Sequence, residues 1–148
     1  MNDMSLLRDY LKSQILKLEG TIVQEVKQKS EILVQHFLSR SKSELYLKDI
    51  PLSKKDIKNL NYLFLELYQN KPIQHIIGET YFYDSKFLTP HGVFIPRPET
   101  ELLVDCAIEF LSNKKERLQI IDFCTGSGCI LLSIAKQFPN HEYIGIDQ

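Results

Sequence analysis

A short turn of small residues joins an apolar segment to an amphipathic one in the second half of the chain. Residues 118–121 are largely apolar and lead through Asp122 into the turn Cys-Thr-Gly-Ser-Gly at residues 124–128. Apolar residues then recur at helical spacing, at Ile130, Leu131, Ile134, Ala135 and Phe138. This pattern predicts a buried strand that enters a helix through a tight loop. Glycines let the backbone approach a ligand, and the helix start offers free N–H groups.

A second strand signal ends in an acid. The run from Tyr143 to Ile146 is followed by Asp147, about 20 residues past the glycines, where a carboxylate can accept both hydroxyls of a ribose. The two segments predict half of a site for a nucleoside-type cofactor, with the glycine turn and Asp147 as its parts. The simpler alternative is a strand-to-helix turn in an enzyme that uses no nucleotide.

The residues that follow the glycines narrow the choice of cofactor. A dinucleotide fingerprint needs a third small residue for close packing of helix and strand, and Leu131 occupies that position. A Walker loop needs Lys-Ser or Lys-Thr after the last glycine, where this chain has Cys129 and Ile130. A cofactor with a ribose and no pyrophosphate remains, and S-adenosylmethionine is the candidate.

Composition sets further bounds. The chain has 148 residues and a formal net charge of −1, so no global basic field favours nucleic acid. No stretch approaches the roughly 18 apolar residues of a membrane span, and acids near the start do not fit a signal peptide. The cysteines Cys106, Cys124 and Cys129 lack CxxC spacing. We therefore expect reduced thiols, no metal site and a cytoplasmic protein.

The first half of the chain predicts a small helical bundle, with helical patterns from residue 3 to about 70. Gly20 is a plausible stop for the first helix, and a second helix is expected to start near Ile22 and run to Leu38. Ser53 is a good N-cap with Asp56 as its capping-box partner. The helix after it carries the apolar stripe Ile57, Leu60, Phe64 and Leu67.

Between residues 72 and 98 the hydrophobic period changes to that of strands. A hairpin is expected around Asp84 and Ser85, followed by a β connector at residues 93–95. Pro98 is well placed in the first turn of the next helix. We expect the apolar side of that helix to consist of Leu103, Cys106, Ala107 and Phe110.

Three segments together resemble the release factor glutamine methyltransferases. They are Lys-Pro-Ile-Gln-His-Ile-Ile-Gly at residues 71–78, Ile-Pro-Arg-Pro-Glu-Thr-Glu at residues 95–101 and Asp-Phe-Cys-Thr-Gly-Ser-Gly at residues 122–128. The resemblance implies an α/β protein with an all-α N-terminal domain: a helical substrate-recognition domain (1–71), a β-hairpin linker (72–97) and the start, βαβ, of a Rossmann-like methyltransferase domain (98–148).

The same resemblance implies an activity. The family transfers a methyl group from S-adenosylmethionine to the side-chain amide of the glutamine in the Gly-Gly-Gln loop of class I peptide chain release factors. Residues 124–128 would form the loop under the cofactor, and Asp147 would hold its ribose. The segment around Arg97 and Glu99 would pack beside the pocket or simply start a helix. No residue is assigned a catalytic role, and no contact with membrane or nucleic acid is expected.

Two positions depart from the family pattern. Cys124 replaces a glycine, and a cysteine there is strained if the backbone needs a positive φ. His75 replaces the usual tyrosine, and we assign it no role. The Cys-containing loop also resembles the sister enzymes that methylate a glutamine of ribosomal protein L3, whereas the segment at residues 97–101 favours release factors.

The family's Asn-Pro-Pro-Tyr clamp, which orients the target amide, is absent from residues 1–148. We therefore expect this chain to be the N-terminal portion of a longer enzyme or a truncated product, and to transfer no methyl group alone. A non-catalytic product that only binds release factors and a nucleic-acid methyltransferase are the alternatives. Two parallel strands with one crossover should leave bare apolar surface at Ile120, Ile121, Ile144 and Ile146.

Overall fold

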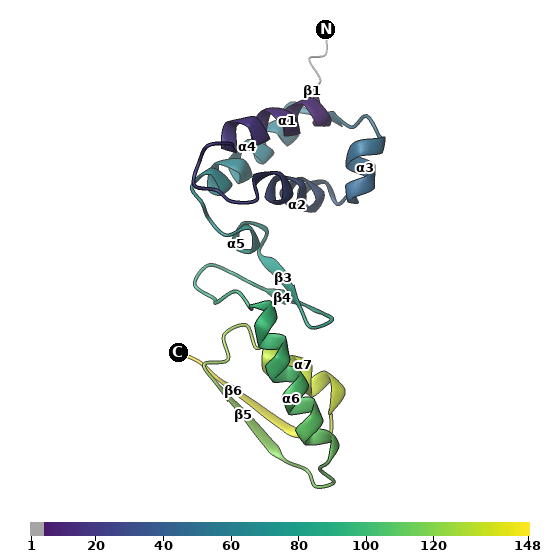
Figure 1. Cartoon of the computed structure of the whole chain (residues 1–148), viewed down its shortest axis with the longest axis vertical. Coiled ribbons are helices and arrows are strands. Elements are labelled where there is room, and N and C mark those ends of the chain that lie inside the picture. The colour runs from purple at the N-terminus through teal and green to yellow at the C-terminus, as the bar shows by residue number, and fades with distance from the viewer. Residues whose placement is uncertain (1–4) are drawn as a thin grey trace. The chain divides into compact units, whose positions relative to one another are not determined.

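The computed structural model describes residues 5–148, which fall into two compact units, one up to Ile77 and the other Gly78–Gln148. The first is called the helical unit below, and the second the α/β unit (Figure 1). The three-part division at residues 71 and 97 concerns function and stays a prediction.

The helical unit confirms the expected bundle. Its apolar core lies between α1, α2 and α4, where Leu11, Leu33 and Leu60 are buried. The elements in chain order are β1 (Ser5–Leu6), α1 (Leu7–Leu18), α2 (Val26–Leu38), α3 (Lys42–Leu47), β2 (Pro51–Leu52), α4 (Lys54–Tyr68) and α5 (Ile73–Ile77).

Helix ends in this unit follow the sequence signals. Helix α1 ends at Leu18, and Gly20 has a φ of +86°, which glycine adopts without a side-chain clash. At the start of α4 the Ser53 hydroxyl accepts a hydrogen bond from the Asp56 N–H at 3.1 Å. The Asp56 carboxylate accepts one from the Ser53 N–H at 3.0 Å, which completes the predicted capping box.

The region before α2 differs from the prediction. Helix α2 begins at Val26 rather than near Ile22, because Glu25 adopts a left-handed conformation with a φ of +54°. Val23 is nevertheless buried in the core. It is apolar because the loop before α2 packs there, and not because it belongs to the helix. The two-residue pairing of β1 with β2 and the short helix α3 were not predicted.

A buried carboxylate joins α3 to α2. The Glu31 side chain lies in the interior, where Lys42 Nζ approaches it at 2.8 Å and the Tyr46 hydroxyl donates a hydrogen bond to it. Burial alone would raise the pKa of Glu31, but the hydrogen bonds from Lys42 and Tyr46 outweigh it and the pKa is lowered. Glu31 is therefore charged, paired and part of the contact that holds α3 in place.

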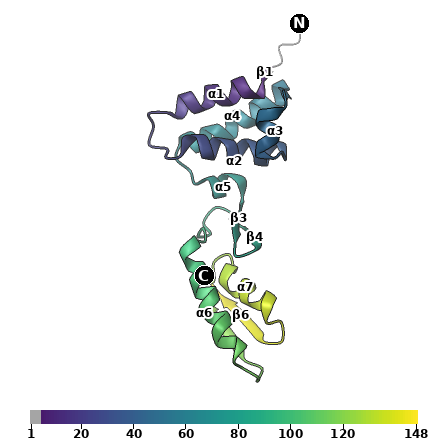
Figure 2. The same ribbon diagram turned by 45° about the vertical axis from the view of Figure 1, so that its right-hand side comes forward.

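The α/β unit combines a hairpin with a helix-covered strand pair (Figure 2). Its core contains Phe82 and Phe87 from the hairpin, Val104 and Leu111 from α6, and Ile134 from α7. The elements are β3 (Glu79–Phe82), β4 (Ser85–Leu88), the 3₁₀ turn η1 (Pro98–Thr100), α6 (Glu101–Ser112), β5 (Gln119–Phe123), α7 (Cys129–Gln137) and β6 (Glu142–Ile146).

The predicted hairpin is present, but its turn is formed by Tyr83 and Asp84, one residue earlier than expected, and Ser85 belongs to β4, where it pairs with Phe82. The expected β connector at residues 93–95 was wrong, because these residues form no strand and Phe94 is exposed. The prediction of a strand here depended only on the apolar character of these residues, and no neighbouring strand pairs with them.

The buried side of α6 was also predicted incorrectly. Leu103, Cys106 and Phe110 are exposed, and the core contacts come from Val104, Ala107, Ile108 and Leu111. The two sets have the same spacing and differ by one residue, which is a rotation of about 100° around the helix. Because α6 is apolar on most of its circumference, its sequence alone does not select the side that packs.

Strands β5 and β6 are parallel neighbours, with Ile120 opposite Tyr143 and Ile121 opposite Ile144. Ile120 and Tyr143 pack into the core, so one face of the pair is covered. On the other face Ile121 and Ile146 remain exposed, as expected, whereas Ile120 is not bare. Across residues 5–148 no helix is both long and apolar enough to cross a membrane.

Acid should destabilise the helical unit. A hydrogen bond from Lys48, with others from Ser41, lowers the pKa of Glu44 to about 2, and hydrogen bonds from Ser53 lower the pKa of Asp56. Such carboxylates contribute stability above their unfolded pKa, and the contribution is lost as the pH falls through the folded pKa. We expect the melting temperature, followed by helical circular dichroism, to fall between about pH 4.5 and about pH 2.

Glu44→Gln provides the control for this titration, because it removes one of the ionisable groups. The variant should lose less stability than the parent chain over the same acidic range. Equal losses in the two proteins would contradict a role for Glu44.

Candidate functional site

The five residues between β5 and α7, called the glycine loop below, follow an alternating backbone path. Cys124, Gly126 and Gly128 all have positive φ, at 62°, 56° and 73°. The N–H groups of Cys124 and Thr125 both donate to the carbonyl oxygen of Ile146, at 2.8 and 3.1 Å. The end of β6 therefore fixes the start of the loop.

Cys124 is the one non-glycine residue among these positive-φ positions of the loop. A Cβ atom in the left-handed region approaches the following carbonyl oxygen and costs about 1–2 kcal/mol. The strain anticipated for a cysteine at this position is therefore present. The thiol of Cys124 is exposed, so no burial of the side chain offsets that cost.

The structure brings Asp147 to the glycine loop. One carboxylate oxygen of Asp147 accepts a hydrogen bond from the Gly126 N–H, and the other accepts one from the Gln148 N–H at 2.8 Å. These two backbone donors, Gly126 first, lower the pKa of Asp147, so the group is ionised at neutral pH. The loop and the acid lie at the carboxyl ends of parallel strands, where α/β proteins bind ligands.

Sequence reasoning missed two contributions to this arrangement. The Thr125 hydroxyl donates to the Asp122 carboxylate at 2.8 Å, which ties the loop back to β5. Gly145 in β6 lies against Thr125, because a Cβ atom on Gly145 would be 3.0 Å from Thr125 Cγ2. The available signal was a glycine inside a strand, which often marks a close approach of another group.

The donor set suits S-adenosylmethionine better than a phosphate-bearing cofactor. Asp147 supplies an exposed carboxylate for hydroxyl groups, and no Lys or Arg lies between Asp122 and the first turn of α7. A Cβ atom on Gly126 would meet nothing within 4 Å, so the backbone there is open to a ligand.

The segment at residues 95–101 contributes a contact within the α/β unit. The Glu101 carboxylate accepts a hydrogen bond from the Tyr83 N–H at 2.8 Å and so joins the start of α6 to the hairpin turn. Pro98 occupies the first turn of η1, as predicted. These contacts give the segment a structural function, and its packing beside a cofactor stays a prediction. His75 lies on α5 of the helical unit.

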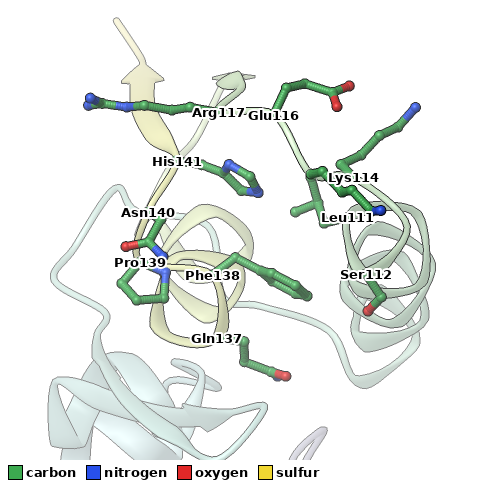
Figure 3. Close-up of a pocket in the computed structure, with 11 residues that line it drawn as sticks. Leu111, Ser112, Lys114, Glu116, Arg117, Gln137, Phe138, Pro139, Asn140 and His141 are labelled. Atoms are coloured by element: carbon green, nitrogen blue, oxygen red, sulfur yellow. The ribbon is translucent and has the colours of Figure 1, made fainter.

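A separate cleft of about 320 Å³ lies before the amino ends of β5 and β6 (Figure 3). His141 Nδ1 accepts a hydrogen bond from the Leu118 N–H at 3.3 Å, and the Phe138 ring stacks on the imidazole. Because the glycine loop follows the opposite ends of the strands, this cleft is not part of the predicted site. Within residues 5–148 no group of three or more His, Cys, Asp and Glu side chains could hold a metal ion.

A parallel strand–helix–strand unit with a glycine loop at its carboxyl end is typical of α/β proteins that bind nucleotide-like ligands. Comparison with known families identifies a second feature. Residues 9–78 match the family described as the PrmC N-terminal domain. Most of the length of this chain is similar to part of proteins named release factor glutamine methyltransferase.

Three curated relatives illustrate the similarity, and each is a release factor glutamine methyltransferase. The protein of Thermodesulfovibrio yellowstonii is 40% identical over 119 residues, which are 78% of this chain and 42% of the relative. That of Chlorobaculum tepidum is 33% identical over 94% of this chain and 49% of its own length. That of Buchnera aphidicola subsp. Acyrthosiphon pisum is 33% identical over 96% of this chain and 50% of its own length. The chain thus spans about half the length of the curated relatives it matches.

Replacing Cys124 by glycine should stabilise the α/β unit. The substitution removes the Cβ clash of the left-handed conformation, and we expect a gain of roughly 1 kcal/mol in unfolding free energy. Chemical denaturation followed by circular dichroism measures it. Cys106→Gly, within helix α6, is the matched control and should destabilise, because glycine is unfavourable inside a helix. A loss of stability in Cys124→Gly would show that the thiol has a stabilising contact.

Proposed function

We propose that this chain is part of an S-adenosylmethionine-dependent methyltransferase that modifies a protein glutamine on its side-chain amide nitrogen. The observation that carries the proposal is the contact between the glycine loop and Asp147 at the ends of parallel strands, in a chain related to release factor glutamine methyltransferases. Those relatives carry the activity in their names, and about half of their length corresponds to this chain.

In this proposal Cys124, Thr125, Gly126, Ser127, Gly128 and Asp147 bind the cofactor. Asp147 accepts hydrogen bonds from the ribose hydroxyls while its other contacts hold it against the loop. The open backbone at Gly126 lets the cofactor approach the loop closely. S-adenosylmethionine supplies an electrophilic methyl group on a sulfonium, and the protein residues here bind and orient it.

The parts of the chain receive separate roles. We assign residues 1–71 to substrate recognition, residues 72–97 to a hairpin linker and residues 98–148 to the start of a Rossmann-like methyltransferase domain. The match of residues 9–78 to a named N-terminal domain supports the first assignment. The parallel pairing of β5 with β6 around α7 supports the last.

We propose class I peptide chain release factors as the partners, with the glutamine of their Gly-Gly-Gln loop as the target. The names of the relatives support a release factor substrate over ribosomal protein L3. Because release factors act in translation, the proposed reaction takes place in the cytoplasm.

Asp147→Ala should weaken cofactor binding. Loss of hydrogen bonds between a charged group and the ribose reduces affinity by roughly tenfold to a hundredfold. Isothermal titration calorimetry with S-adenosylmethionine, on the complete gene product that contains residues 1–148, measures the effect. Glu116→Ala is the matched control, because Glu116 is an exposed acid that precedes the opposite end of β5. Equal affinities of the parent protein and Asp147→Ala would remove Asp147 from the site.

The substrate assignment predicts a defined product. Incubation of the complete gene product with S-adenosylmethionine and a class I release factor should add one methyl group, about 14 Da, to the peptide that contains the Gly-Gly-Gln sequence. Tandem mass spectrometry locates the group on the glutamine side chain. Modification of ribosomal protein L3 in a parallel reaction, with none on the release factor, would overturn the assignment.

A further inference from the structure

Gly145 occupies a position in β6 where a side chain would crowd Thr125. A Cβ atom built on it would lie 3.0 Å from Thr125 Cγ2 and 3.2 Å from Thr125 Oγ1. Its backbone has no positive φ, so conformational freedom does not explain the glycine. Glycine weakens a strand interior and is retained where another group approaches closely. The group that approaches here is the Thr125 side chain.

Thr125 is held from three directions. Its hydroxyl donates to the Asp122 carboxylate at 2.8 Å, and its N–H donates to the Ile146 carbonyl oxygen at 3.1 Å. Its methyl group lies against Gly145. Thr125 therefore connects the carboxyl end of β5 to the carboxyl end of β6 and has little freedom to shift.

The residue next to Thr125 in the chain makes the contact on which the proposed site depends. The Gly126 N–H donates to the Asp147 carboxylate, and Asp147 lies two residues beyond Gly145 in β6. A movement of Thr125 relative to β6 must change this hydrogen bond, because both of its partners are attached directly to the segments that Thr125 joins.

We propose that Asp122, Thr125 and Gly145 form an interlock that positions Gly126 and Asp147 for the ribose of the cofactor. This inference rests on the proposed function. Asp122 and Gly145 need not touch the cofactor, so they are positioning residues, and Thr125 of the proposed cofactor loop is the side chain that they hold. The interlock works by shape at Gly145, where an added Cβ atom would press on Thr125, and by hydrogen bonding at Asp122.

The shape component predicts a rescue. Gly145→Ala places a methyl group against Thr125 and displaces the loop by a few tenths of an ångström. We expect it to weaken S-adenosylmethionine binding by roughly tenfold, because hydrogen bonds weaken when their distances and angles depart from the optimum. Thr125→Ser removes the Cγ2 methyl group but keeps the hydroxyl for Asp122. The added Cβ atom would still lie 3.2 Å from the hydroxyl oxygen, so the double variant Gly145→Ala with Thr125→Ser should regain part of the affinity.

The hydrogen-bond component has its own variant. Thr125→Val keeps the shape of the side chain and removes the donor to Asp122, so we expect roughly threefold to tenfold weaker binding. Thr80→Val in β3 is the matched control, because it makes the same chemical change away from the glycine loop and should leave affinity unchanged.

The experiment is calorimetric titration of the complete gene product and its variants with S-adenosylmethionine, with thermal unfolding measured in parallel. If the interlock exists, Gly145→Ala and Thr125→Val bind the cofactor more weakly than the parent protein although they are folded to the same extent. The double variant then recovers affinity relative to Gly145→Ala. Parent-like affinity in Gly145→Ala, or no recovery in the double variant, overturns the interlock while the proposed function stands. Absence of binding by the parent protein overturns both.

Discussion

Parallel pairing of β5 with β6 is the constraint on which the candidate site depends. Parallel strands end at the same edge of a sheet, and the crossover through α7 returns the chain so that residues far apart in sequence meet there. The Ile146 carbonyl oxygen then accepts two hydrogen bonds from the start of the glycine loop. With that anchor in place, the Gly126 N–H meets the Asp147 carboxylate. Without the pairing, the glycines and the acid are unrelated parts of the sequence.

The helical unit has a different source of stability. Its core is a single set of buried apolar side chains between α1, α2 and α4, supplemented by two capping boxes and by the buried pair of Glu31 and Lys42. The α/β unit is less complete, because Ile121, Phe123 and Ile146 expose one face of its strand pair. Parallel sheets are normally covered on both faces.

How far local pattern predicts structure is clear from individual elements. Ser53 with Asp56 and the stripe ending in Leu67 defined α4 correctly, because capping and amphipathic period agree there. For helix α6 the same pattern did not identify the buried side. Two stripes one residue apart are equally apolar, and the one that contains Val104 and Leu111 packs into the core. Residues 93–95 had strand-like composition but no partner strand. Strands require long-range neighbours, and no local pattern supplies those.

The sequence by itself determined the helical character of the first half, the hairpin, the strand–loop–helix order around residues 124–128 and the family resemblance that comparison confirmed. These features depend on residue types close together in the chain. The tertiary structure alone decided the contact of Gly126 with Asp147, the left-handed backbone of Cys124 and the fit of Thr125 against Gly145. Each of these depends on the distance between atoms on different elements, which is set only when the strands pair and the core packs.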